Sequence, residues 1–251
     1  MRFVFGLLSF MEKITAYLQG KGYGAGTVRA EVDAVANFLG SDPALCVDIG
    51  GNVGNYSAEL QRRFPNCEIH IFEPSSVNLA KLRGRFECDR ITICPYAVSS
   101  SEGSATLYAD SPGSGLASLS KRNMAHHGKT FEFEEPIETI VFQDYWKQFL
   151  GERPIDLVKL DIEGHELDAL SGFGEALKNI KIIQFEFGGC NIDSRTYFRD
   201  FFEFFNATGF SLFRISPVGL CHVNRHREAD EFFSTTNWLA VNNALTHTPS
   251  R

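Results

Sequence analysis

The sequence lacks several features that mark particular classes of protein. It has only six cysteines among 251 residues, and no two of them have the C-x-x-C spacing of a zinc site or a redox dithiol. It has no cluster of lysines and arginines, and its net charge is -7. Affinity for a phosphate backbone depends on clustered cations, so a nucleic-acid partner is not expected.

Long hydrophobic runs are also missing. The apolar stretch from Phe3 to Met11 is too short to span a membrane, and Glu12 and Lys13 follow it without a small-residue cleavage site. We expect an amphipathic helix that caps the domain or a partner subunit, with a membrane-surface anchor as the alternative. Cysteines such as Cys46, placed in apolar segments, are typical of a reducing compartment and predict a cytoplasmic protein.

Helix-type and strand-type patterns alternate along the chain and predict a doubly wound, Rossmann-like α/β fold. Strands separated by helices of about ten residues indicate right-handed crossovers and a mostly parallel sheet. We expect residues 1–44 to form a helical cap, residues 45–245 to form one domain and residues 246–251 to be a disordered tail. The expected strands are 45–49, 68–73, 91–98, 155–161, 180–187, 210–215 and 238–241, and the expected helices are 27–39, 56–64, 75–86, 166–177 and 197–207.

The periodicity weakens between residues 99 and 136, where serine and glycine accumulate. Irregular segments of this length inside a compact domain are usually functional or disordered. We expect short strands at 105–108 and 130–133 and a mobile loop between them. The loop either helps to shape a site or is an insertion without a role.

A glycine-rich turn follows the first predicted strand, with the sequence Asp48-Ile-Gly-Gly-Asn-Val-Gly54. It opens a helix, so its backbone can approach a ligand closely. Strand two ends in Glu73, at about the spacing of 20 residues at which an acid binds ribose hydroxyls. The anionic Asp48 would repel a pyrophosphate and favour a cation such as the sulfonium of S-adenosylmethionine. A tight turn without a ligand is the alternative.

These motifs resemble those of a known family. Residues 47–54 resemble motif I of class I methyltransferases, and Phe72-Glu73-Pro74 followed by Asn78 resembles the FkbM family. The run 159–166 is similar to that family's signature after strand four, and residues 185–197 resemble its polysaccharide-associated members. The resemblance implies a seven-stranded sheet with an antiparallel last strand, S-adenosylmethionine as methyl donor and an adenine site at residues 96–98. The predicted cofactor-binding residues are Asp48, Gly50, Asn52, Val53, Gly54, Glu73, Pro74, Asn78, Ala97 and Asp161.

Ionisable residues follow two central strands, on the rim where such sheets bind ligands. Methyl transfer needs an aligned nucleophile and a proton acceptor, and Asp161, His165 and Glu186 are the candidate catalytic residues. His165 titrates near neutral pH, but it could instead only pack beside the acidic residues that stabilise a helix start. Asp161 and Glu186 could hold a divalent metal, although we expect none.

Four polar residues, Glu163, Asn191, Arg195 and Asn237, are the predicted contacts of a polyhydroxylated acceptor. Alternatively, the 191–197 region only supplies Asp193 or Ser194 as the N-cap of the Phe-rich helix. The phenylalanine side chains of that helix predict packing in the core and at a subunit interface, and therefore a possible homodimer.

We accordingly predict an O-methyltransferase acting on a sugar, a glycan or a small natural product. The competing hypotheses are an NAD-dependent oxidoreductase on a related fold and a non-catalytic nucleoside-binding module.

Overall fold

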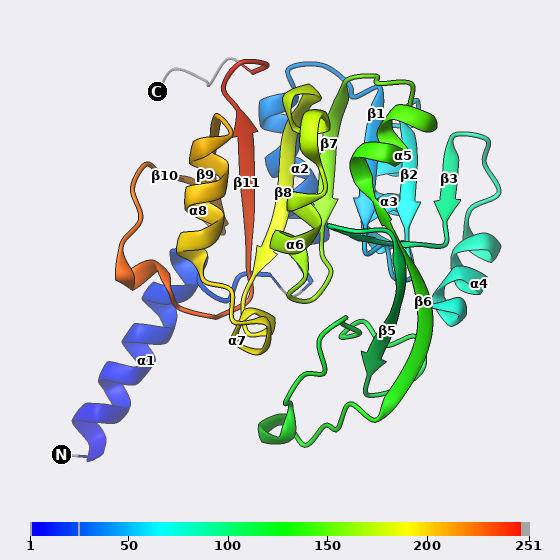
Figure 1. Ribbon diagram of the computed structural model, residues 1–251. Coiled ribbons are helices and arrows are strands. Elements are labelled where there is room, and N and C mark those ends of the chain that lie inside the picture. Colours follow the sequence, from blue (N-terminus) through cyan, green and yellow to red (C-terminus); the bar gives the residue numbers. More distant parts are fainter. Residues whose placement is uncertain (1, 25, 247–251) are drawn as a thin grey trace.

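One large sheet, covered by helices on both faces, organises the chain (Figure 1). This computed structural model describes residues 2–24 and 26–246. The sheet has eight strands in the order β10-β9-β11-β8-β7-β1-β2-β3. Their bounds are β1 Leu45–Ile49, β2 Glu68–Phe72, β3 Ile91–Cys94, β7 Ile155–Leu160, β8 Ile180–Phe187, β9 Phe210–Ser216, β10 Gly219–Val223 and β11 Thr236–Asn242.

The strand directions confirm the predicted doubly wound sheet. Strands β1, β2, β3, β7 and β8 pair in parallel, and β11 runs antiparallel between β8 and β9. The predicted seven strands are therefore present with their antiparallel last strand. An eighth strand, β10, pairs with the outer edge of β9. Its side chains are mostly exposed, so its sequence carries no buried-strand pattern.

Two hydrophobic cores lie on opposite faces of the sheet, and strand residues alternate between them. Cys46 of β1 packs with one core, whereas Val47 packs with the other. Helices α2 Val28–Leu39, α3 Asn55–Arg63 and α4 Ser76–Arg85 contribute to the first core, and α5 Phe142–Gln148, α6 Glu166–Ser171 and α8 Phe198–Ala207 to the second. The helix predicted for 166–177 ends at Ser171 and continues as a 3₁₀ turn, Gly174–Asn179.

The Phe-rich helix α8 forms part of the second core. Phe198 and Phe201 are fully buried, and Phe198 stacks on Trp238 of β11 with ring centroids 4.2 Å apart. Phe202 and Phe204 are partly buried against the same core. The helix thus packs inward, and the subunit interface stays a prediction.

The single strand expected at 91–98 is divided between the large sheet and a small second sheet. Strand β3 ends at Cys94, and Pro95, which has no backbone N–H to donate, separates it from β4 (Ala97–Ser99). Strand β4 pairs with β6 (Phe133–Val141), and β6 forms an antiparallel pair with β5 (Gly103–Ala109). The strand expected at 130–133 therefore begins later and runs to Val141.

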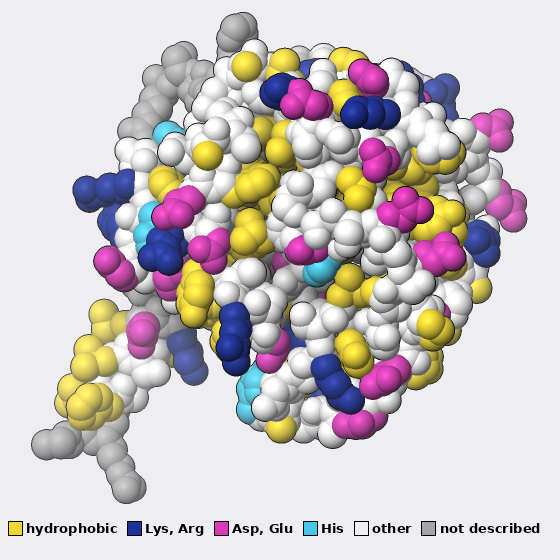
Figure 2. All heavy atoms as spheres, viewed as in Figure 1, with side chains coloured by type: hydrophobic (Ala, Val, Ile, Leu, Met, Phe, Trp, Pro, Cys, Tyr) yellow, Lys and Arg dark blue, Asp and Glu magenta, His cyan; other side chains and the backbone are white. Residues whose placement is uncertain are grey.

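The N-terminal region contains two helices with different surroundings. Helix α2 packs against α3, β8 and β11, whereas α1 (Arg2–Leu18) points away from the rest of the chain (Figure 1). Figure 2 shows hydrophobic side chains gathered along α1. The exposed apolar residues of α1 are Phe3, Val4, Phe5, Leu7, Leu8, Phe10, Met11, Ile14, Tyr17 and Leu18.

The cap predicted for residues 1–44 thus has a structural counterpart in α2. Across residues 2–24 and 26–246, no helix combines the length and the apolar character needed to cross a membrane. Thr246 is buried, and residues 247–251 of the predicted tail lie outside the described residues.

Candidate functional site

The glycine turn after β1 brings two strand ends into close contact. Gly50 has a φ of +86°, and a Cβ atom there would lie 1.9 Å from the carbonyl oxygen of Asp161. The backbone N–H groups of Gly50 and Gly51 donate to the carbonyl of Phe72 at 2.9 and 3.0 Å. Only glycine fits at position 50, because both the backbone angle and the space exclude a side chain.

Gly54 has a packing role in the structure, and its predicted contact with a cofactor stays a prediction. A Cβ at this position would lie 2.4 Å from the ring of Phe86, so its lack of a side chain lets α3 approach the end of α4. Its φ of +80° also suits glycine. Gly54 lines none of the three cavities described below.

Glu73 anchors the turn from the end of β2. Its Oε2 accepts a hydrogen bond from the backbone N–H of Asn52 at 2.8 Å, and its Oε1 accepts one from Ser75 at 2.8 Å. Burial raises the pKa of this carboxyl, against the effect of those bonds. Each carboxylate oxygen can accept a further hydrogen bond, so Glu73 retains acceptor capacity toward the cavity it lines.

Three adjoining cavities surround the carboxyl ends of the central strands. The Glu73 chamber is lined by Ile49, Gly50, Phe72, Pro74, Ala97 and His165 among others. The Lys159 chamber is lined by Glu31, Asp48, Val53, Tyr56, Lys159 and Asn237 among others. The Arg122 chamber is lined by Leu116, Arg122, His126, His127, Asp193 and Phe233 among others.

A carboxylate stands at each boundary between these chambers. Asp161 lines both the Glu73 and Lys159 chambers, together with Gly50 and Asn52. Glu163 lines both the Glu73 and Arg122 chambers. Glu186 lines both the Lys159 and Arg122 chambers. The three acids therefore surround the place where the cavities meet.

Most of the predicted cofactor residues lie in two of these chambers. Gly50, Asn52, Glu73, Pro74, Ala97 and Asp161 line the Glu73 chamber, and Asp48 and Val53 line the Lys159 chamber. Asn78 is buried, and its Oδ1 accepts a hydrogen bond from Lys81 at 3.4 Å. Like Gly54, Asn78 supports the turn region from outside the cavity linings.

Asp48 is buried under the turn. Its Oδ2 accepts a hydrogen bond from Ser57 at 2.5 Å. Burial raises the pKa of Asp48 to about 6, although Ser57 and Lys159 oppose the rise. Asp48 therefore stays largely ionised at neutral pH, but its charge is shared with Lys159 rather than presented alone to a ligand.

Lys159 is a residue that our reasoning from the sequence missed. Its side chain is 4% exposed, and its Nζ lies 3.1 Å from Oδ2 of Asp161 and 5.6 Å from the ring centre of Tyr56. Burial disfavours its charge, but Asp161, Glu31 and Glu186 raise the pKa of Lys159 above its ordinary value. A lysine within a strand of buried apolar residues is rare without a partner, and this signal could have identified it.

Glu186 and Glu163 line the Arg122 chamber, as Asp193 does. Burial and the neighbouring Asp161 raise the pKa of Glu186 well above its ordinary value. The same two causes raise the pKa of Glu163 to about 8, although Arg122 opposes the rise. A carboxyl with a raised pKa is a stronger base once ionised, so either side chain is suited to accept a proton near neutral pH.

His165 lies on the other side of the site. Its Nε2 is 3.1 Å from the hydroxyl of Ser99 and 2.9 Å from Oδ2 of Asp168, and its ring lines the Glu73 chamber. Burial lowers the pKa of His165, against the effect of Asp168. These contacts join α6 to β4, and the assignment of the proton acceptor among His165, Glu163 and Glu186 stays a prediction.

Two of the predicted acceptor contacts lie away from the cavities. Asn191 is fully buried, accepts a hydrogen bond from the N–H of Gly188 at 2.8 Å and donates to Thr196 at 2.8 Å. Its polar atoms thus hold the start of α7 (Cys190–Ser194) in place. Arg195 is exposed at the end of α7 and lines none of the three chambers.

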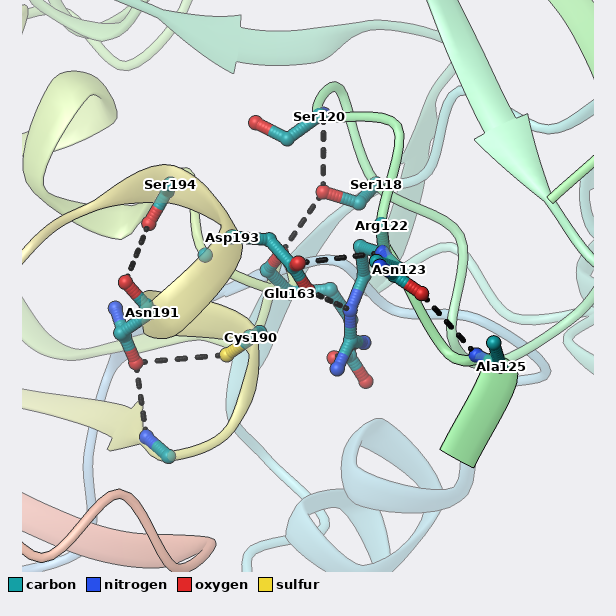
Figure 3. Close-up of polar contacts among 12 residues, drawn as sticks. Ser118, Ser120, Arg122, Asn123, Ala125, Glu163, Cys190, Asn191, Asp193 and Ser194 are labelled. Carbon is teal, nitrogen blue, oxygen red and sulfur yellow. Dashed lines mark hydrogen bonds and ion pairs between the residues drawn. The ribbon is translucent and has the colours of Figure 1, made fainter. Parts of the chain in front are cut away.

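Asn237 and Glu163, the other two predicted acceptor contacts, do line these cavities. Asn237 is buried in the Lys159 chamber, and Glu163 is shared with the Arg122 chamber. The predicted N-cap of the Phe-rich helix was wrong, because Tyr197 occupies that position and its backbone N–H donates to Asp200 at 2.9 Å. Asp193 points instead toward Arg122 (Figure 3).

Arg122 was also missed. Its guanidinium donates to Oε2 of Glu163 at 2.5 Å, and its Nε lies 3.5 Å from Oδ2 of Asp193 (Figure 3). Its side chain is only 6% exposed, although it comes from the irregular Ser/Gly-rich segment. The sequence carried little signal for it, because Lys121 and Lys129 in the same segment are also basic.

Comparison with known proteins identifies one family. The sequence pattern of the family described as "Methyltransferase FkbM domain" matches residues 48–212. This range includes the glycine turn after β1, the acidic residues at the ends of β7 and β8, and Arg122. The match covers more than half of the chain.

Three curated relatives are about one quarter identical to the chain over the regions that align. "Methyltransferase 1" of Beauveria bassiana is 25% identical over 53% of this chain and 60% of its own length. "2-O-methyltransferase NoeI" of Sinorhizobium fredii is 25% identical over 72% of this chain and 78% of its own length. "Hexuronic acid methyltransferase AglP" of Haloferax volcanii is 26% identical over 62% of each. The chain thus spans less than two thirds of some of these relatives.

Proposed function

The chain belongs to the FkbM methyltransferase family, and on that basis we propose that it transfers a methyl group from S-adenosylmethionine to a hydroxyl oxygen of a sugar, a glycan or a small natural product. The observation that carries this proposal is the meeting of three cavities at Asp161, Glu163 and Glu186. The Glu73 and Lys159 chambers suit the two ends of the donor, which leaves the Arg122 chamber for an acceptor.

The donor fits the Glu73 and Lys159 chambers. Glu73 retains acceptor capacity for ribose hydroxyls, and the absence of a side chain at Gly50 leaves the backbone bare where the two chambers join. In the Lys159 chamber, the ammonium of Lys159 suits a carboxylate, and Glu31 and Asp161 suit an ammonium group. Asp161 at the junction favours a sulfonium by its negative charge.

The bound donor would supply an electrophilic methyl group with a good leaving group. The chain's own residues then have to align the acceptor oxygen and accept its proton. We assign proton acceptance to Glu186, because it lies between the Lys159 chamber and the Arg122 chamber. Its raised pKa also makes its carboxylate a stronger base than that of an ordinary glutamate. Lys159 holds Asp161 at 3.1 Å and thereby orients the acid that faces the donor.

The acceptor fits the Arg122 chamber, whose walls combine His126, His127, Asn123 and Asp193 with the apolar side chains of Leu116 and Phe233. Such a mixture suits a ring with several hydroxyl groups, which offers hydrogen bonds at its edge and C–H groups on its faces. Two of the relatives, a 2-O-methyltransferase and a hexuronic acid methyltransferase by name, support an oxygen acceptor on a sugar.

Thermal shift and product analysis test this proposal. We expect S-adenosylmethionine and S-adenosylhomocysteine to raise the melting temperature of the purified chain and NAD to have no effect, since a ligand of the native state stabilises it by mass action. With a panel of methyl glycosides and free uronic acids, the chain should release S-adenosylhomocysteine and add a methyl group detectable by mass spectrometry.

Each alternative has its own outcome. Stabilisation by NAD alone would support an oxidoreductase. Binding of S-adenosylmethionine without methylated product from any member of the panel would support a nucleoside-binding module. Methyl groups found on nitrogen would contradict the proposed oxygen acceptor.

A further inference from the structure

The irregular segment 111–129 forms a wall of two chambers at once. Its residues Ser114, Gly115 and Ala117 line the Glu73 chamber, whereas Leu116 and Met124 line the Arg122 chamber. The backbone also lies against the cofactor turn, since a Cβ on Gly115 would come within 2.8 Å of Nδ2 of Asn52. The segment therefore separates the proposed donor site from the proposed acceptor site.

Polar contacts hold this segment in place. Ser118 pairs with Tyr108 of β5 through two backbone hydrogen bonds and donates its hydroxyl to the carbonyl of Glu163 at 2.8 Å. The backbone N–H of Asn123 donates to Oδ1 of Asp193 at 3.2 Å. Arg122 lies between these points and contacts both Glu163 and Asp193 (Figure 3).

Arg122 joins three separate parts of the chain. Glu163 lies in the turn after β7, Asp193 lies in α7, and Arg122 comes from the segment itself. A planar guanidinium presents several N–H donors in fixed directions, so one arginine can hold two carboxylates that a lysine would contact less well. All three side chains are less than 20% exposed, so solvent weakens these contacts little.

We propose that Arg122 is a positioning residue for methyl transfer, which fixes segment 111–129 over the acceptor chamber and holds Glu163 at the boundary with the donor chamber. This inference rests on the proposed function. It adds that Arg122, which takes no part in the methyl-transfer step itself, determines which acceptor binds. The acceptor's fit then depends on the placement of Leu116, Asn123 and Met124, all of which move if Arg122 releases its partners.

The test compares Arg122→Met with Arg122→Lys, using Lys121→Met as the matched control. Lys121 is the neighbouring cation, its side chain is 49% exposed and its partners are the exposed Glu132 and Glu134. The acceptor probe is the uronic acid or methyl glycoside with the highest wild-type turnover, and S-adenosylhomocysteine binding is measured separately by calorimetry.

We expect Arg122→Met to raise the KM for the acceptor probe on the order of 10- to 100-fold, as the loss of a largely buried charge contact typically does. Its affinity for S-adenosylhomocysteine should fall by about threefold or less, because strand ends form most of the donor site. Arg122→Lys should recover part of the KM, and Lys121→Met should behave as the wild type.

Two results would overturn the inference. One is an Arg122→Met enzyme with the KM and kcat of the Lys121→Met control. The other is a loss that follows thermal stability alone and disappears when the variant is assayed well below its melting temperature. If Arg122→Met does not fold, Asp193→Asn removes one partner and should raise the same KM. A wild-type chain that binds no S-adenosylhomocysteine would contradict the proposed function instead.

Discussion

The two halves of the site are built from different kinds of structure. The proposed donor half consists of the ends of β1, β2 and β7, which a backbone contact at Gly50 and backbone hydrogen bonds to Glu73 hold together. The proposed acceptor half consists of segment 111–129 and α7, which side-chain ion pairs of Arg122 hold together. The donor half is thus fixed by the sheet, whereas the acceptor half depends on a few charged side chains.

This difference explains how one fold can serve many acceptors. Changes in a loop wall alter the acceptor chamber without disturbing the strands, and α/β folds commonly carry their variable binding residues on such loops. The following predictions test whether the two halves respond separately, beginning with the variant that should affect turnover most.

Glu186→Gln should lower kcat by about 10²- to 10⁴-fold, the usual contribution of a general base. Affinity for S-adenosylhomocysteine should change little, because this product has no sulfonium charge for Glu186 to attract. The melting temperature should hold or rise, because the variant removes a charge that burial and Asp161 disfavour. Steady-state kinetics at saturating donor, with differential scanning fluorimetry, measure both. Wild-type kcat would remove Glu186 from the mechanism.

Gly50→Ala should reduce donor affinity on the order of a hundredfold, because the new Cβ would collide with the carbonyl of Asp161 and the backbone angle is strained for alanine. The matched control is Gly84→Ala in α4, where a Cβ meets nothing within 4 Å. Alanine is the better helix former there, so the control should bind normally and melt at the same or a higher temperature. Calorimetry with S-adenosylhomocysteine compares them; equal affinities would show that the turn does not contact the donor.

The pH profile distinguishes the candidate bases. A carboxylate base acts when ionised, so kcat/KM should rise about tenfold per pH unit until the coupled acids lose their protons, near the pKa of about 8 of Glu163 or above. If His165 were the base, the plateau would begin below pH 6.5, because burial lowers its pKa from that value. A plateau that begins below pH 6.5 would therefore contradict the assignment to Glu186.

The same titration affects stability with a definite sign. The folded pKa of Glu163 is raised from 4.5 to about 8, so its protonated form stabilises the fold at low pH and this contribution is lost as pH rises across that window. Urea unfolding between pH 5 and 9 should show stability falling while activity rises, and Glu163→Gln should flatten the fall.

Asn191→Ala should change turnover least. It leaves the buried N–H of Gly188 without its acceptor, which costs about 1–3 kcal/mol of stability. The KM for the acceptor probe should stay near the wild-type value, since Asn191 lines no chamber among the three. Urea unfolding and steady-state kinetics measure the two effects, and Arg195→Met should leave both unchanged. A KM effect of Asn191→Ala at full stability would return this residue to the acceptor site.

Reasoning from the sequence placed most of the predicted donor-binding residues around two adjoining cavities because their determinants are local, and their binding of the donor stays a prediction. The order of strands and helices, the glycine turn and the acid at the end of β2 each lie within a few consecutive residues, and the sheet topology then brings Asp161 and Glu186 to the same rim. Periodicity and strand-end position are sufficient for such features.

The contacts of Arg122 were not predicted from the sequence because they join residues far apart in the chain. Arg122 and Glu163 are separated by 41 positions, and nothing in the spacing of the irregular segment indicates that they pair. Asn191 and Arg195 looked equally suitable as acceptor contacts in the sequence. In the structure, Asn191 is fully buried and Arg195 is exposed to solvent. The direction in which a side chain points in a short irregular helix is not fixed by a periodic pattern.

The clustering of Asp161, Glu163 and Glu186 has a consequence for ligand binding. Burial and the neighbouring Asp161 raise the pKa values of Glu163 and Glu186, so these two side chains retain protons near neutrality, and a cation placed beside them would drive those protons into the solvent. Binding of a sulfonium should therefore release protons, whereas its uncharged thioether analogue should release fewer. Calorimetry in buffers of different ionisation enthalpy would record this as a buffer-dependent heat for S-adenosylmethionine that is smaller for S-adenosylhomocysteine.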